Sequence, residues 1–252
     1  MFRFIFKLYN FSKIQIYVCF FLLIIAVNAS SKVILENYKD TDEMTIKIEG
    51  EIDKTEFSDF VKAFKQLKRN KQKLHLNAIQ LNSPGGLLQQ GKQIGWFIRH
   101  NELNTYLAPD SRCSSSCVYI LVGGIIRLAY GRVGVHRSTP ANSTPDADLI
   151  SERLDLLNFS ISQYFKDMGM SEQLITATLI IPNWSIRYLT EDEKWNWGVL
   201  GIEPVHEELY FRRAARKLGI SFDEFKERFQ DQLENCRTQA RAFENIYFDC
   251  VK

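Results

Sequence analysis

The segment Leu81–Gly86 constrains this chain more than any other, because it ends an apolar run with Ser-Pro-Gly-Gly. The run from Leu74 to Leu81 is typical of a buried strand, and an amphipathic helical pattern begins after Gly86. A strand that breaks at such a sequence turns sharply and leaves backbone N–H groups free at the start of a helix. Those groups, with the positive end of the helix dipole, suit a developing negative charge. We therefore predict an anion-binding turn here.

Two further motifs follow along the chain. The segment Cys113–Cys117, Cys-Ser-Ser-Ser-Cys, is a small-residue turn that leads into apolar sequence. The segment Val135–Arg137 places His136 at the end of a short strand-like run. A glycine-rich turn, then a serine, then a histidine is an order that fits a serine hydrolase.

These motifs resemble the proteolytic subunit of Clp protease, whose wider group includes the crotonase fold and signal peptide peptidase A. The resemblance runs from about Lys32 to Glu203. It includes Arg187–Thr190 and Trp197–Leu200, which look like the closing helix and the Gly-Leu turn of that family. The resemblance implies an α/β fold of repeated β-β-α units with a mainly parallel sheet, followed by a small helical appendage. It also implies a homo-oligomer, with subunit contacts on a long helix after His136.

Ser115 is the candidate nucleophile, because it matches the central serine of the family's turn. A serine hydroxyl needs a base to remove its proton, and His136 has that role in the family order. Ser114 and Ser116 are rivals on sequence alone, and a cluster of serines can also simply cap a helix. A cysteine nucleophile, Cys113 or Cys117, is a further alternative.

The oxyanion donors predicted from the resemblance are the backbone N–H groups of Gly86 and Ser116. The third catalytic member departs from the family pattern, because Ile186 stands where the Clp-type acid would fall. Asn183 is the candidate that would orient His136 through its amide. The alternatives are carboxylates from the following loop and long helix, namely Asp146, Asp148 and Asp155.

Residues 1–29 have the organisation of a secretory signal. Arg3, Lys7 and Lys13 precede an uncharged stretch from Ile14 to Val27, which is short for a spanning helix of about 20 residues. We expect a periplasmic or secreted protein, and an uncleaved anchor facing outside the cytoplasm is the alternative. Without this segment 29 basic residues stand against 30 acidic ones, which gives no electrostatic case for nucleic acid.

The mature chain would hold four cysteines in an oxidising compartment. Three pairings are open, and we favour Cys113–Cys117 with Cys236–Cys250, because each is local. The first bridge would brace the turn that holds Ser115. Free buried thiols are the other interpretation.

Strand-like and helical periods alternate with short connections, which predicts βαβ crossovers in a mainly parallel sheet. Expected strands are 44–48, 74–81, 105–108, 125–130 and 132–136, and expected helices are 55–69, 87–98, 115–122 and 149–168. Residues 139–145 form a loop. We divide the chain into a signal (1–29), an α/β domain (32–203) and a helical extension (204–252) whose helices meet at Gly219–Ser221.

The function that these features favour is an exported serine hydrolase, a peptidase acting on a peptide or protein substrate. An inactive Clp-like module that binds peptides or supports assembly is the alternative, and a crotonase-like acyl-thioester enzyme is a third. No spacing suggests a metal site, and no phosphate-binding or dinucleotide motif is present. We therefore expect no cofactor.

Overall fold

The structure is a computed structural model that describes residues 32–39, 41–139 and 147–242. The predicted secretory segment, residues 1–29, lies outside this range, as does most of the predicted 139–145 loop. Within the described residues, no helix combines the length and the apolar character that crossing a membrane would require.

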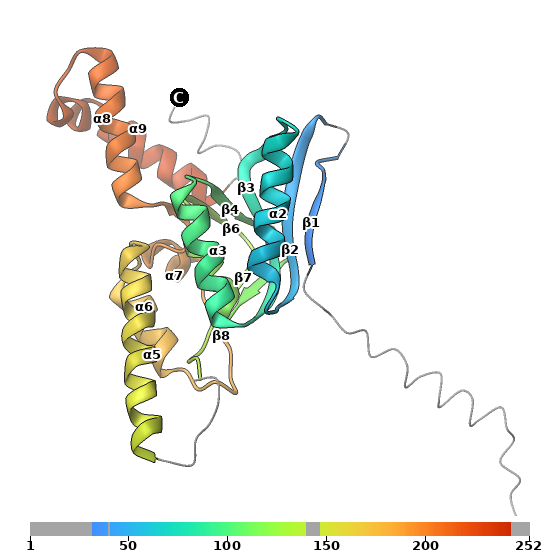
Figure 1. The fold of residues 1–252 in the computed structure, drawn as a ribbon. Helices are drawn as coiled ribbons and strands as arrows, with labels where there is room; N and C mark the ends of the chain where they lie inside the picture. The colour runs from blue at the N-terminus through green and yellow to red at the C-terminus, as the bar shows by residue number, and fades with distance from the viewer. Residues whose placement is uncertain (1–31, 40, 140–146, 243–252) are drawn as a thin grey trace, which may run out of the picture. The chain divides into compact units, whose positions relative to one another are not determined.

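Strands and helices alternate along the chain (Figure 1). The N-terminal half contains β1 (Lys32–Asn37), β2 (Glu43–Ile52), α2 (Glu56–Arg69), β3 (Lys73–Gly86), α3 (Leu88–His100), β4 (Asn104–Leu107), β5 (Arg112–Ser114) and α4 (Ser116–Val122). The C-terminal half contains β6 (Ile126–Ala129), β7 (Arg132–Val135), α5 (Ala147–Asp167), α6 (Glu172–Ile180), β8 (Arg187–Tyr188), α7 (Glu191–Asn196), β9 (Gly201–Ile202), α8 (Pro204–Leu218) and α9 (Phe222–Ala242).

The sheet forks at β3. Its first part pairs with β4, and its later residue Ser83 pairs with Cys113 of β5. One arm continues from β4 to β6 and β9, and the other continues from β5 to β7 and β8. Pairing is parallel from β2 through β3 to both arms and antiparallel only at β1, β8 and β9. The predicted α/β fold with β-β-α units and a mainly parallel sheet is confirmed.

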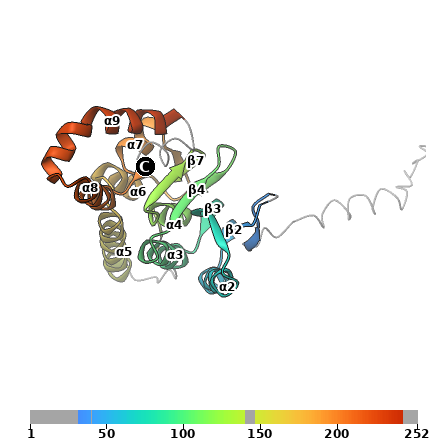
Figure 2. The same cartoon turned by 90° about the horizontal axis from the view of Figure 1, so that it is seen from above.

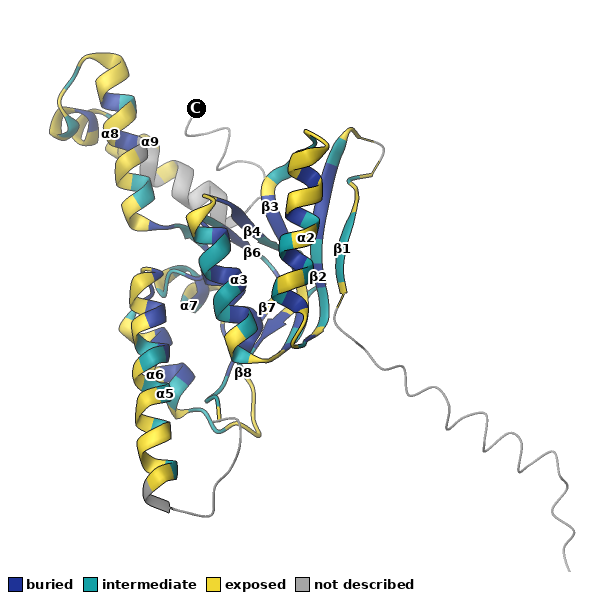
Figure 3. Ribbon diagram, in the orientation of Figure 1, coloured by how far each residue is buried: buried dark blue, intermediate teal, exposed yellow. Residues whose placement is uncertain are grey.

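Helices cover one face of the strands. α2 and α3 lie side by side, and α4 packs between α3 and the strands of both arms (Figure 2). The apolar face of β2, with Ile46 and Ile48 fully buried, meets this helical layer. Figure 3 shows the inner faces of these elements buried and much of the surface of α5 and α8 exposed. The core therefore lies between the forked sheet and α4.

The predicted turn at Ser-Pro-Gly-Gly is wrong, because β3 continues through it. Gly85 and Gly86 pair with Glu51 and Ile52 of β2, and the N–H of Leu87 donates to the Ile52 carbonyl at 2.8 Å. The pairing with β2 satisfies backbone groups that a free turn would leave open. The Ser83 hydroxyl donates to the Gly50 carbonyl at 2.5 Å and accepts from the Gly85 N–H at 3.1 Å, which shapes this last part of the strand.

Other differences concern short elements. β1, β5 and α6 carry too little periodic sequence to be predicted. Arg187–Tyr188 is a strand, so the segment that resembles the family's closing helix begins as β8 and becomes helical only in α7. Trp184, in the segment between α6 and β8, is 81% exposed.

The C-terminal extension consists of α8 and α9. Gly219 ends α8 in the left-handed conformation, with φ +70°, and Ser221 accepts a hydrogen bond from the Glu224 N–H at 3.1 Å. Phe211, Ala215 and Phe225 form a small apolar cluster of their own. The two helices thus meet at Gly219–Ser221 as predicted, and Ser221 caps the second.

Candidate active site

Ser115 lies between β5 and α4 in an unusual backbone conformation. Its φ is +56° and its ψ is −125°, a region that non-glycine residues rarely adopt. Such a conformation costs about 1–3 kcal/mol and persists only where the surroundings impose it. A serine forced into a sharp strand-to-helix turn is also the geometry that presents a nucleophilic hydroxyl at the end of a sheet.

Several contacts impose this conformation. The Ser115 N–H donates to the Gly134 carbonyl at 3.0 Å, and its own carbonyl accepts from Val118 at 3.0 Å. A disulfide joins Cys113 to Cys117 across the turn, as predicted. Gly85 lies so close that a β-carbon there would be 2.6 Å from the Ser115 β-carbon. The turn is therefore held from the sheet, from the helix and from β3.

The three neighbouring serines differ in exposure. Ser114 and Ser116 are buried, with exposed fractions of 1% and 2%, and within the described part of the chain their hydroxyls have no hydrogen-bond partner. Ser115 is half-buried. Of the three serines, Ser115 is therefore the most accessible to an incoming substrate.

His136 is the first residue after β7, the strand next to β5. Ser114 pairs with Gly134, so Ser115 and His136 both lie just beyond this pair, at the carboxyl ends of adjacent parallel strands. His136 is half-buried, and its Nδ1 lies 3.0 Å from the Arg137 carbonyl oxygen. Among the described residues, no hydrogen bond joins the Ser115 hydroxyl to the ring. Catalytic hydrogen bonds are often long before substrate binds, and the strand register brings the two residues to the same edge.

The two predicted oxyanion donors lie in different surroundings. The nitrogen of Ser116 begins α4, and a β-carbon on Gly85 would lie 3.1 Å from it. A β-carbon on Gly86 would instead collide with the backbone of Ile52 in β2. Gly85 is thus the residue of the Ser-Pro-Gly-Gly segment that meets the serine turn, and sequence analysis had singled out Gly86. The consecutive glycines were the only sequence signal for this close approach.

The candidates for a third member are scattered. Asn183 is exposed in the segment between α6 and β8, and among the described residues its side chain makes no hydrogen bond. Asp155 is exposed on α5. The side chains of Asp146 and Asp148 lie outside the described part of the chain. No carboxylate in the described residues forms an ion pair or a hydrogen bond with His136.

Two further predictions concern the second disulfide and the absence of a metal site. The side chains of Cys236 and Cys250 lie outside the described residues. Over the described ranges, no group of three or more histidine, cysteine, aspartate or glutamate side chains is arranged to hold a metal ion.

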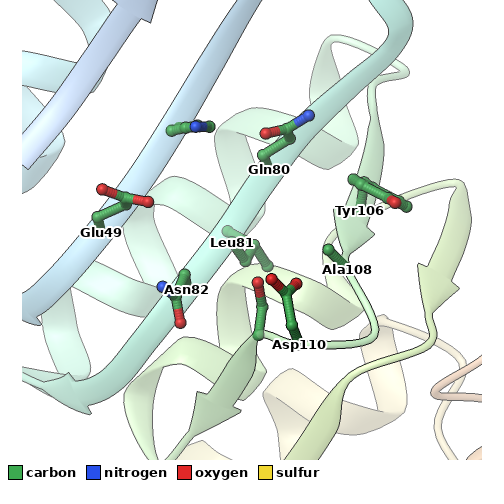
Figure 4. Close-up of a pocket in the computed structure, with 9 residues that line it drawn as sticks. Glu49, Gln80, Leu81, Asn82, Tyr106, Ala108 and Asp110 are labelled. Atoms are coloured by element: carbon green, nitrogen blue, oxygen red, sulfur yellow. The ribbon is translucent and has the colours of Figure 1, made fainter.

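A polar pocket of about 220 Å³ occupies the fork of the sheet. Its lining includes Glu49, Gln80 and Asn82 from β2 and β3 and Asp110 from the loop after β4 (Figure 4). A shallower groove of about 480 Å³ follows α6 and includes Arg187 and Trp197. None of the predicted catalytic or oxyanion residues lines either one.

No family model matches the chain, and no curated protein matches it. Solved structures that are similar to it include a mutant of ClpP1 from Listeria monocytogenes, with 18% sequence identity and a TM-score of 0.46. That match covers 62% of this chain and 88% of the other. A mutant of the 1510-N membrane-bound stomatin-specific protease has 16% identity and a TM-score of 0.45, over 61% of this chain and 75% of the other. A second mutant of that protease, in complex with a substrate peptide, has 17% identity and a TM-score of 0.45, over 61% and 71%.

Proposed function

We propose that this chain is an exported serine hydrolase, a peptidase that uses Ser115 as nucleophile and His136 as general base. The observation that carries the proposal is the backbone of Ser115, a non-glycine residue at φ +56° in a strand-to-helix turn. His136 directly follows β7, the strand that pairs with β5 just before Ser115. Strain of this kind at a serine is typical of a functional turn rather than of an ordinary helix cap, and the strand register brings His136 to the same edge of the sheet.

The proposed reaction proceeds through a covalent ester on Ser115. The Ser115 oxygen attacks the carbonyl carbon of the scissile bond while Nε2 of His136 takes the hydroxyl proton. The carbonyl oxygen becomes negatively charged and accepts from the N–H groups of Ser116 and Gly86, since the Gly85 N–H already donates to the Ser83 hydroxyl. The tetrahedral intermediate then expels the amine, which receives the proton from His136. Water attacks the resulting ester by the same steps and restores the serine.

Covalent labelling tests this proposal. A fluorophosphonate probe reacts with a serine only when a base activates its hydroxyl, so we expect labelling that maps to Ser115 by peptide mass spectrometry. Ser114→Ala and Ser116→Ala are the matched controls, because both positions flank the nucleophile and both side chains are buried. Labelling of another serine would assign the nucleophile to that residue. A wild type in which no serine is labelled would contradict the hydrolase proposal.

The second candidate function is a module without catalytic activity. Within the described residues, His136 has no carboxylate partner and no hydrogen bond to Ser115. A module that keeps the fold and binds peptides without cleaving them fits this arrangement. A wild-type protein that binds peptides without cleaving them, and that the fluorophosphonate probe does not label, would support this function.

The export proposal rests on the sequence of residues 1–29 and has its own test. We expect the mature protein to begin near Ser30 and to be found outside the cytoplasm. N-terminal sequencing of the exported protein measures this. A full-length chain in the membrane fraction after alkaline extraction would select the anchored form instead.

A further inference from the structure

The hydrogen bond of His136 sets the tautomer of its ring. Nδ1 lies 3.0 Å from the main-chain oxygen of Arg137. A carbonyl oxygen only accepts, so Nδ1 must carry the hydrogen, and the neutral ring then has its lone pair on Nε2. A general base that takes the proton of a serine through Nε2 needs this tautomer. The contact therefore prepares His136 for the role proposed above.

The residue that supplies the accepting carbonyl is anchored through its N–H. The N–H of Arg137 donates to the carbonyl of Ile181 at 2.7 Å. Ile181 ends α6, and its own N–H donates to Ala177 within that helix. Just before His136, Val135 pairs with Arg187 of β8. The short segment that contains His136 is thus held on both sides, which limits the movement of Arg137 relative to the ring.

We propose that the main-chain carbonyl of Arg137 orients His136, in the place where a Ser-His-Asp triad uses a carboxylate. The inference rests on the proposed function, and it makes Arg137 a positioning residue that acts through His136. No carboxylate in the described residues contacts the ring, and Asn183 is exposed without a hydrogen bond there. A carbonyl dipole selects the tautomer as a carboxylate does. It stabilises the protonated ring less, because it carries no full charge.

Nuclear magnetic resonance tests the tautomer directly. The protein is labelled with ¹⁵N-histidine, and long-range ¹H–¹⁵N spectra are recorded at a pH of about 9, where an ordinary imidazole is neutral. Signals missing in His136→Gln assign the ring among the four histidines of the chain. Free imidazole side chains in water favour hydrogen on Nε2, so we expect His136 to differ by carrying it on Nδ1. Hydrogen on Nε2, or averaging between the two, would overturn the inference.

Variants separate the carbonyl from the side chains nearby. Arg137→Ala keeps both main-chain groups and should keep the Nδ1–H tautomer. Asn183→Ala should keep it as well, and a change of tautomer in that variant would assign the orienting role to the amide instead. Arg137→Pro removes the N–H that donates to Ile181. In this variant the Arg137 carbonyl should no longer stay beside the ring, so both tautomers of His136 should be populated. The rate of probe labelling should fall by at least the fraction of His136 rings that carry hydrogen on Nε2.

The two proposals fail in different ways. A wild type that is labelled at Ser115 but has hydrogen on Nε2 of His136 overturns the orienting role and leaves the hydrolase intact. A wild type with hydrogen on Nδ1 that is never labelled overturns the hydrolase and, with it, the catalytic purpose of the contact. Labelling together with the Nδ1–H tautomer and its loss in Arg137→Pro supports both.

Discussion

Gly85 lies directly against the turn that carries Ser115, with no room for a side chain between them. A β-carbon built on Gly85 would lie 2.6 Å from the Ser115 β-carbon and 2.6 Å from the Ser114 carbonyl oxygen. Because real β-carbons do not approach other atoms so closely, this position accepts only glycine. The end of β3 thus presses on the turn that carries the proposed nucleophile.

Gly85→Ala should therefore damage both stability and the site. Its φ of +104° adds strain to the collision, and the serine turn would have to move. We expect a loss of more than about 1–2 kcal/mol in the free energy of unfolding, measured in urea, together with loss of probe labelling. Gly219→Ala is the matched control, because Gly219 has φ +70° and no neighbour within 4 Å of a β-carbon. The control should be destabilised only by the backbone strain at its positive φ and should still be labelled. Equal effects in both variants would contradict the packing argument.

Ser115→Ala and His136→Ala should each abolish labelling and hydrolysis while the fold persists. Their double variant should be no less active than either single one, because groups that act as a unit are not additive. Residual turnover and circular dichroism together measure this. Independent, multiplying losses would mean that the two residues do not work together.

The bridge between Cys113 and Cys117 should stabilise both the fold and the turn. Closing so short a loop restricts the unfolded chain by about 2 kcal/mol, and the bridge also holds Ser115 in its strained conformation. We expect the double variant Cys113→Ala, Cys117→Ala to unfold at lower urea concentration and to be labelled more slowly. Wild type treated with reductant in mild urea should approach the variant. Unchanged labelling in the variant would leave the bridge a role in stability alone.

Glu203 should make stability depend on acid pH. Burial alone would raise the pKa of this carboxyl, but hydrogen bonds from the His206 side chain and from the N–H groups of His206 and Val205, together with the charge of Arg99, hold the pKa below its usual value. The carboxylate therefore stabilises the fold above its unfolded-state pKa of about 4.3, and this contribution is lost as the pH falls through the lower folded-state value.

Glu203→Gln should cost about 1.5–3 kcal/mol at pH 7, the usual range for a hydrogen bond to a charged group. The difference from wild type should shrink in acid, as measured by urea unfolding at several pH values. Glu208→Gln is the control, because that residue is exposed on α8, the helix that Glu203 caps. A difference that stays constant down to pH 3 would mean that the carboxylate charge is not responsible.

The long helix α5 carries exposed apolar side chains that suit a subunit contact. Leu156 and Phe159 are 63% and 70% exposed. We predict that the wild type is an oligomer and that Leu156→Ser with Phe159→Ser lowers its mass in light scattering without changing stability by more than about 0.5 kcal/mol. Glu152→Ser, an exposed change on the same helix, is the control. A monomeric wild type would contradict this prediction.

Local patterns in the sequence determined the elements whose signals lie within a few residues. The apolar spacing predicted a helix over 55–69, and α2 runs from Glu56 to Arg69 with Thr55 as its N-cap. Gly219 and Ser221 marked the junction of α8 and α9, because a left-handed end and a hydroxyl cap depend only on their own neighbourhood. The bridge from Cys113 to Cys117 was found in the same way, since its two residues share one turn.

The tertiary structure alone decided what depends on segments far apart in the chain. Nothing near Ser-Pro-Gly-Gly reveals that β2 pairs with it and keeps it extended, or that Gly85 rather than Gly86 meets Ser115. The burial of Ser114 and Ser116, and the backbone of Ser115 itself, follow from that close contact and from the pairing of β5 with β7. These features arise from strand pairing between distant residues, and such pairing leaves no periodic trace in either segment by itself.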